Sequence, residues 1–162
     1  MSSSPTTAPF DSEGGFRQAL DTVITAATQE IRVFDRNLTR IQLDQKDRAE
    51  AIERFLAGDH YRRLRIIVHD PEHCERYCPR LLAMLRRFSQ AVEFRQSPNE
   101  LRHLSECLLL ADRAQAAVRF HSDHPRGKII LDAPEEVHPW WQRFEELWGL
   151  STPCLSATRL GL

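Results

Sequence analysis

The sequence predicts an α/β domain, a layered α/β/α sandwich with a mainly parallel sheet and one antiparallel hairpin. Short apolar runs alternate along the chain with segments that repeat apolar residues at helical spacing, which is typical of a sheet covered by helices. Two later apolar runs are separated by too few residues to hold a helix, so we expect them to pair antiparallel. At 162 residues the chain has the length of a single domain.

The first half of the chain predicts two strands and two helices. Apolar residues recur at helical spacing from Phe16 to Ala27, and the pattern changes to period two in the strand 29–35. A loop leads to Asp44, which is suited to cap the next helix, and Gly58 is suited to end it. The second strand is LRIIVHDP, residues 64–71, whose apolar run on both faces favours the inside of a parallel sheet.

The second half predicts a helix over 79–89, a strand over 91–97 and a short helix or turn over 97–104. Strands over 106–112 and 116–122 form the hairpin, and a further short strand covers 128–132. A closing helix spans 134–150, with Trp140, Phe144, Leu147 and Trp148 along one side, where large aromatic side chains are most simply part of the core.

Residues 1–13 are expected to form a disordered polar leader, because small polar residues and prolines bury too little surface to become ordered. Residues 14–162 then make the single domain. The leader lacks the basic and apolar segments of a signal peptide, and no run is long enough to span a bilayer. Four cysteines in a chain of this length indicate reduced thiols. We therefore expect a cytoplasmic protein without a membrane partner.

Ligands of parallel sheets collect beyond the carboxyl ends of the strands. Arg36 directly follows the first predicted strand, His69 lies at the end of the second, and Arg95 lies near the end of the third. Arg113 and Arg119 come from the hairpin. Arginine is suited to bidentate contacts with anions, so these five residues are the candidates for holding an anionic ligand.

The stretch SECLLLAD, residues 105–112, is an apolar strand that ends in an aspartate. With the order of elements, it resembles one half of the phospholipase D superfamily, whose signature is His-x-Lys-x(4)-Asp on the strand after a β-α-β-α-β unit. Counting back from Asp112 places Cys107 at the lysine position and Ser105 at the histidine position. The Gly-Ser-x-Asn segment that often follows in the family corresponds to RFHS, residues 119–122. The closing FEELW, residues 144–148, resembles the Phe-x-x-x-Trp near the end of such domains.

The resemblance implies a phospholipase-D-like fold that has lost the attacking histidine and the phosphate-holding lysine. We therefore expect a pseudoenzyme without catalytic residues, which acts as a binding or association module for an anionic, phosphate-bearing ligand. Two facing motifs in the family imply a homodimer. Uncharacterised bacterial domains of this kind are sometimes appended to acetyltransferases, which implies an accessory role beside such a partner.

Two other functions stay open. A hydrolase or phosphodiesterase would use Ser105 or Cys107 as a substituted nucleophile, with His103 as the base that activates Ser105. A nucleic-acid-binding accessory protein would use arginine-rich segments such as HYRRLR, residues 60–65. Acidic residues are scattered among these arginines and the formal net charge is −1, so nucleic acid is the less favoured partner.

The stretch HDPEHCERYC, residues 69–78, contains four residues of types that bind zinc, His69, His73, Cys74 and Cys78. Its spacing lacks the Cys-x2-Cys knuckle of zinc sites, and Cys74 and Cys78 share one face of a helix. Cysteines that pack inward are the favoured interpretation. We expect no bound metal and no cofactor.

Overall fold

The computed structural model describes residues 4–157. Its elements follow in the order β1 (Thr6–Phe10), α1 (Glu13–Ala26), β2 (Glu30–Asp35), α2 (Lys46–Gly58), β3 (Arg63–Val68), α3 (Glu72–Tyr77), α4 (Pro79–Arg87), β4 (Val92–Gln96), the single 3-10 turn η1 (Asn99–Leu101), β5 (Cys107–Ala111), β6 (Gln115–His121), β7 (His124–Leu131), α5 (Pro134–Leu150) and β8 (Thr152–Pro153). None of the helices in this range is long and apolar enough to cross a membrane.

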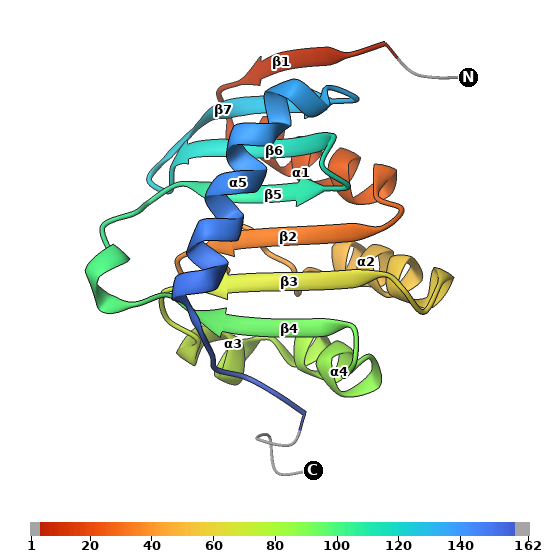
Figure 1. Cartoon of the computed structure of the whole chain (residues 1–162), viewed down its shortest axis with the longest axis vertical. Coiled ribbons are helices and arrows are strands. Elements are labelled where there is room, and N and C mark those ends of the chain that lie inside the picture. Colours follow the sequence, from red (N-terminus) through yellow and green to blue (C-terminus); the bar gives the residue numbers. More distant parts are fainter. Residues whose placement is uncertain (1–3, 158–162) are drawn as a thin grey trace.

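One mixed sheet forms the middle layer, with the strand order β1-β7-β6-β5-β2-β3-β4-β8 (Figure 1). Among residues 4–157, only β2 with β3 and β3 with β4 pair in parallel. The expectation of a mainly parallel sheet is therefore wrong. Parallel neighbours need a helical crossover, and only α2 and the pair α3–α4 provide one inside the sheet. Short turns join β5, β6 and β7, and β5 returns to pair antiparallel with β2.

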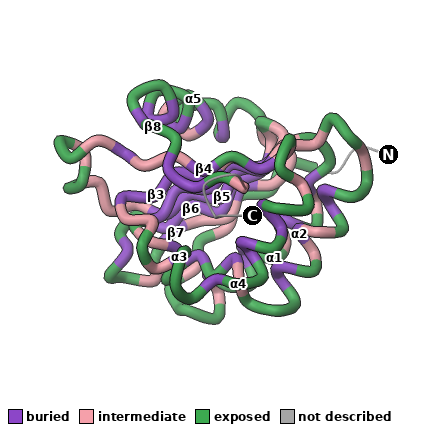
Figure 2. The backbone as a smooth tube through the Cα atoms, turned by 90° about the horizontal axis from the view of Figure 1, so that it is seen from below, coloured by how far each residue is buried: buried purple, intermediate pink, exposed green. Residues whose placement is uncertain are grey.

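Helices cover both faces of the sheet. α1, α2, α3 and α4 lie on one face and α5 crosses the other (Figures 1 and 2). Side chains alternate along β2, so Val33 packs into the core under the first four helices and Phe34 into the core under α5. β2 is buried over nearly its full length, as expected for a strand between two helical layers.

The expected disordered leader contains a strand. β1 pairs antiparallel with β7, from Thr6 opposite Leu131 to Phe10 opposite Gly127. Its polar, proline-containing sequence carries no strand pattern, so the strand depends on the edge that β7 offers. Ser12 then caps α1, because its hydroxyl oxygen accepts the N–H of Gly15 at 3.0 Å. Residues 1–3 of the expected leader lie outside the described residues.

The residue that caps α2 differs from the one expected. Gln45 caps α2, since its side-chain oxygen accepts the N–H of Arg48 at 2.9 Å. Asp44, expected in that role, instead accepts the N–H of Leu81 in the first turn of α4 at 2.9 Å. The loop between β2 and α2 is thereby tied to α4, which follows it in sequence by more than thirty residues.

Gly127 lies where three strands pack closely, opposite Arg119 of β6 and Phe10 of β1. A Cβ atom there would stand 1.8 Å from the carbonyl oxygen of Val118 and 2.7 Å from the ring of Phe10. We expect Gly127→Ala to lower the free energy of unfolding by ~1–3 kcal/mol, because the strands must separate locally. Urea unfolding monitored by circular dichroism measures the loss.

Gly149 of α5 is the matched control, because a Cβ there meets nothing within 4 Å. Gly149→Ala should be neutral or stabilise the protein by up to ~1 kcal/mol, since alanine favours the helix. Equal effects of the two substitutions would contradict the close packing at Gly127.

Candidate functional site

The carboxyl ends of β2, β3 and β4 lie at one edge of the sheet, on the left in Figure 1. Because β5 is antiparallel to β2, its first residue, Cys107, comes to the same edge. Cys107 faces Arg119 across the β5–β6 pair, and the N–H of Ser122 donates to the carbonyl of Ser105 at 2.7 Å. Strand pairing thus brings together Ser105 and Cys107 with the residues that correspond to the family's Gly-Ser-x-Asn segment. We call this edge the carboxyl edge.

Asp35 is fully buried at the centre of the carboxyl edge. One carboxylate oxygen accepts the N–H of Arg36 at 2.7 Å, and the other accepts those of Arg40 and Ile41 at 3.1 and 2.8 Å. Burial raises the pKa of Asp35, and the amide bonds, led by that of Ile41, act against this increase. The carboxylate therefore holds the loop 36–41, including Leu38, whose φ of 67° is unusual for leucine.

Cys107 is also fully buried, and its thiol donates to Asp35 at 3.5 Å. Burial, followed by the charge of Asp35, raises the pKa of this thiol well above its ordinary value. The thiol therefore stays protonated, and it fills the strand interior as a small apolar group.

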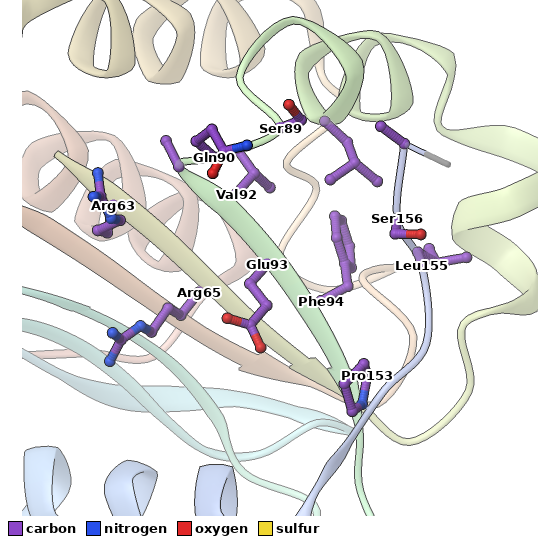
Figure 3. Close-up of a pocket in the computed structure, with 13 residues that line it drawn as sticks. Arg63, Arg65, Ser89, Gln90, Val92, Glu93, Phe94, Pro153, Leu155 and Ser156 are labelled. Carbon is purple, nitrogen blue, oxygen red and sulfur yellow. The ribbon is translucent and has the colours of Figure 1, made fainter. Parts of the chain in front are cut away.

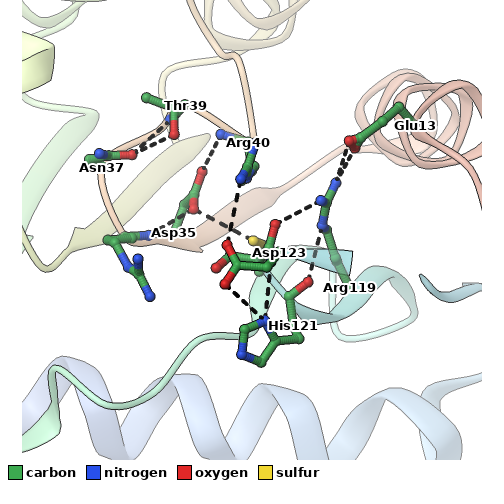
Figure 4. A network of polar contacts seen from close by, with 11 residues as sticks. Glu13, Asp35, Asn37, Thr39, Arg40, Arg119, His121 and Asp123 are labelled. Atoms are coloured by element: carbon green, nitrogen blue, oxygen red, sulfur yellow. Dashed lines mark hydrogen bonds and ion pairs between the residues drawn. The ribbon is translucent and has the colours of Figure 1, made fainter. Parts of the chain in front are cut away.

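Arg119 is 1% exposed and occupies the space between α1 and the end of β6 (Figure 4). It pairs with Glu13 of α1, donates to the carbonyl of Ser122 at 2.7 Å, and lies 4.9 Å from the ring centre of Phe16. A buried guanidinium is stable only when its donors are satisfied, and these partners satisfy most of them. Where the resemblance places a glycine, the chain has an internal ion pair.

His69 and Ser97 make a second buried pair, from the ends of β3 and β4. The carbonyl of Leu104 can only accept, so Nε2 of His69 carries the proton and donates at 2.8 Å. The Ser97 hydroxyl then donates to Nδ1. Burial, followed by other influences that include the charges of Arg102 and Arg36, lowers the pKa of His69, so the ring is neutral at pH 7. Ser97 gave no signal in the sequence, because the contact joins residues 28 positions apart.

An exposed cationic rim borders this buried set. It consists of Arg36, Arg40 and Arg102. Arg40 lies 3.6 Å from Asp123 (Figure 4), whereas the guanidinium groups of Arg36 and Arg102 form no ion pair with any residue in 4–157. The charges of both arginines lower the pKa of His69, so each guanidinium group acts on that ring from the rim. Sequence analysis identified Arg36 but missed Arg102, which lies in a turn that gives no strand-end signal.

Three of the sequence-predicted residues lie elsewhere. Asp112 and Arg113 lie in the tight three-residue turn 112–114 between β5 and β6, at the opposite edge, and both have positive φ. Asp112 accepts the N–H groups of Thr28, Gln29 and Glu30 at 2.7–2.9 Å, so it fastens the entry to β2. Arg95 lies under α5, where it donates to the carbonyl of Trp148 at 2.9 Å.

The four residues with zinc-ligand chemistry in the stretch 69–78 do not converge. Both nitrogens of the His69 ring bond to protein groups, and Cys74 and Cys78 lie in the core under α3 and α4. Within residues 4–157, no group of three or more His, Cys, Asp or Glu side chains is placed to hold a metal ion.

A pocket of about 380 Å³ lies away from the carboxyl edge, beside the amino-terminal half of β4 (Figure 3). Arg63, Arg65 and Glu93 line one side of it, and Phe94 and Leu155 line another. Arg65 also lies within 3.7 Å of Glu30, and the pocket therefore offers less unneutralised charge than the rim.

A family model described as "Domain of unknown function (DUF7931)" matches residues 12–160. No curated protein matches the chain. Nuc from Salmonella typhimurium, a phospholipase D family member, is 14% identical with a TM-score of 0.62, covering 94% of this chain and 100% of its own. NucT from Helicobacter pylori is 12% identical with a TM-score of 0.58, covering 93% and 100%.

The archaeal chromatin protein TrmBL2, whose structure shows a novel mode of DNA binding, is 14% identical with a TM-score of 0.63, covering 91% of this chain and 54% of its own. These likenesses confirm a phospholipase-D-like fold. At such identities they concern the fold alone.

We expect Asp35→Asn to lower the free energy of unfolding by ~1–3 kcal/mol, because an amide NH₂ would face backbone N–H groups that now donate to a carboxylate. Urea unfolding at pH 7 measures the change. Asp123→Asn, at an exposed site in the same network, is the control and should change stability by less than ~1 kcal/mol. A tolerated Asp35→Asn would show that this carboxylate does not hold the loop.

The lowered pKa of His69 predicts a pH dependence of stability. As the pH falls below 6.5, the unfolded histidine binds a proton before the folded one does, so His69 contributes a loss of up to ~1.4 kcal/mol per pH unit. Unfolding free energies between pH 7 and pH 5 measure the slope, which should be smaller in His69→Gln. The raised pKa of Asp35 contributes to the pH dependence with the opposite sign. Asp35 is present in both proteins, so this contribution does not explain a difference between their slopes. His60→Gln, at an almost fully exposed side chain, should keep the wild-type slope.

Proposed function

The chain belongs to the DUF7931 family, and we propose that it is a non-catalytic phospholipase-D-like module that binds an anionic, phosphate-bearing ligand at the carboxyl edge. The observation that carries this proposal is the pair of exposed guanidinium groups, Arg36 and Arg102, which lack a carboxylate partner among residues 4–157. Arginine binds phosphate oxygens in a bidentate manner, so two such groups on one rim suit a phosphate ester.

The buried residues support the absence of catalysis. Phosphodiester attack needs an accessible nucleophile that is activated by a base. The Cys107 thiol is buried and held in its protonated form, and Arg119 with Glu13 fills the neighbouring space. β5 begins only at Cys107, so Ser105 and His103 do not share a strand face as a nucleophile and its base would.

Four arginines and one histidine were expected to hold the anion. Of these, Arg36 is proposed as a direct contact. His69 and Arg119 act from inside, because their side chains bond to protein groups and position the loops of the rim. Arg95 and Arg113 have no part in it, since they lie under α5 and at the opposite edge.

Association completes the proposal. A homodimer through the carboxyl edge would place the two rims face to face, and repulsion between the arginines would then favour a bound anion between them. An acetyltransferase is the expected class of enzyme partner. A second candidate ligand is DNA, because TrmBL2 shares this fold and is described by its mode of DNA binding.

Phosphate binding tests the proposal. We expect inorganic phosphate to shift amide resonances of residues 36–41 and 102–105 in an NMR titration. Arg36→Gln and Arg102→Gln should each weaken binding by ~3–10-fold, since each removes one charged contact. Arg86→Gln is the control, because it changes an exposed arginine on α4, far from the rim. Shifts elsewhere, or equal affinity in all variants, would contradict the assignment of the rim.

The same proteins separate the remaining alternatives. Incubation with bis(p-nitrophenyl) phosphate should release no nitrophenolate above the buffer blank; release that is lost in Ser105→Ala or Cys107→Ala would establish the substituted hydrolase instead. A DNA duplex that binds more tightly than phosphate, with an affinity that falls steeply with salt, would favour the nucleic-acid function.

A further inference from the structure

Two cysteines outside the carboxyl edge form a close pair. Cys74 lies inside α3, and Cys78 follows the last residue of that helix, four positions later. The N–H of Cys78 donates to the carbonyl of Cys74 at 3.3 Å, so the two residues are one helical turn apart. Side chains at this spacing lie on the same face, and both belong to the core cluster under α3 and α4.

Cys78 lies where two helices meet. It ends α3 and precedes Pro79, the first residue of α4, and its φ of −119° and ψ of 63° are not helical. The positive end of the α4 dipole favours a thiolate at this position, and the negative end of the shorter α3 dipole acts against it. The neighbouring Cys74 thiol lowers the pKa of Cys78, although burial and the charge of Asp44 act against this.

A surface pocket gives access to this sulfur. The pocket measures about 370 Å³, and Cys78 lines it together with His73 and Tyr77 of α3 and with Leu38 and Thr39 of the loop after β2. The rings of His73 and Tyr77 lie 5.2 Å apart, and Tyr77 is 65% exposed. Both cysteines are buried, but Cys78 is 4% exposed and borders the pocket, whereas Cys74 is 0% exposed and does not. Cys78 is therefore the outer and Cys74 the inner thiol of the pair.

We propose that Cys78 and Cys74 form a peroxide-sensitive dithiol, with Cys78 as the attacking residue and Cys74 as the resolving residue. The oxidant is a hydroperoxide that enters through the pocket. The Cys78 thiolate attacks one peroxide oxygen, the O–O bond breaks, and the other oxygen leaves as water or an alcohol after taking a proton. The product is a sulfenic acid on Cys78.

Cys74 completes the reaction. Its sulfur attacks the Cys78 sulfur, the S–O bond breaks, and the leaving hydroxide takes up the Cys74 thiol proton to form a second water. Both thiols together lose two electrons, which reduce the hydroperoxide. In the reduced pair, the interaction with Cys78 is the first cause of the raised pKa of Cys74. Oxidation of Cys78 removes this contribution.

The last turn of α3 must tighten for the disulfide to form. Cβ atoms one helical turn apart are separated by ~5–6 Å, and a disulfide needs ~3.5–4.5 Å. The change is local, because α3 has only six residues and the backbone at Cys78 is already outside the helical region. It would move the pocket wall against Leu38 and Thr39, which belong to the loop that Asp35 holds. The proposal does not depend on anion binding at the rim.

Peptide mapping of the full-length protein after treatment with hydrogen peroxide tests the proposal. At stoichiometric peroxide we expect a Cys74–Cys78 disulfide, seen as the loss of two hydrogen atoms from the peptide that holds both residues and reversed by dithiothreitol. Cys78 should react at least ~10-fold faster than Cys107, whose raised pKa leaves little thiolate. This measurement on the wild-type chain needs no substituted protein to fold.

Variants identify the two roles. Cys74→Ser should stop at a sulfenic acid on Cys78, trapped as its dimedone adduct, and Cys78→Ser should leave Cys74 reduced. Cys154→Ser is the matched control and should form the disulfide as the wild type does. A Cys74–Cys154 disulfide, faster oxidation of Cys107, or no reaction of Cys78 under these conditions would each overturn the proposal.

Discussion

Asp35 is the group on which the carboxyl edge depends. A carboxylate buried in the middle of a sheet is costly unless hydrogen bonds replace its water, and here three backbone N–H groups and the Cys107 thiol do so. These hydrogen bonds stabilise the buried carboxylate, and the same bonds fix the loop that follows β2. That loop carries Arg36 and Arg40 to the rim and contributes Leu38 and Thr39 to the pocket beside Cys78. Two separate surface features thus share one buried anchor.

Asp112 plays the corresponding role at the other end of β2. Because β5 runs antiparallel to β2, the residue that ends β5 meets the residues that begin β2, and its carboxylate accepts three backbone N–H groups there. This gives a physical reason for an aspartate at the last position of a motif that has neither the histidine nor the lysine. The aspartate fastens the sheet, and its contribution does not require the chemistry at the far end of the strand.

Packed side chains occupy the positions at which the resemblance places site residues. Cys107 is a small buried thiol where the resemblance places a lysine, and Arg119 pairs with Glu13 where it places a glycine. The Arg119 side chain is buried and the Glu13 side chain is half exposed, so loss of Glu13 would leave a buried charge with less compensation. These interior groups are therefore structural, and of the three arginines of the rim, Arg36 and Arg102 form no ion pair within residues 4–157. The proposal of binding without catalysis rests on this division.

Local patterns in the sequence determined most of the helices and strands, because apolar spacing depends only on near neighbours. They also located the hairpin and the polar ends of the strands. Strand direction, the edge strand β1 and the placement of Asp112 were decided only by the tertiary structure, since each depends on pairing between distant segments. The candidate site divides in the same way. Arg36 follows a strand and could be read from the sequence, whereas Ser97 and Arg102 join it only because β4 and the turn after it fold back onto His69. The sequence indicated some of the residues that could bind an anion, and long-range pairing decided which residues lie together.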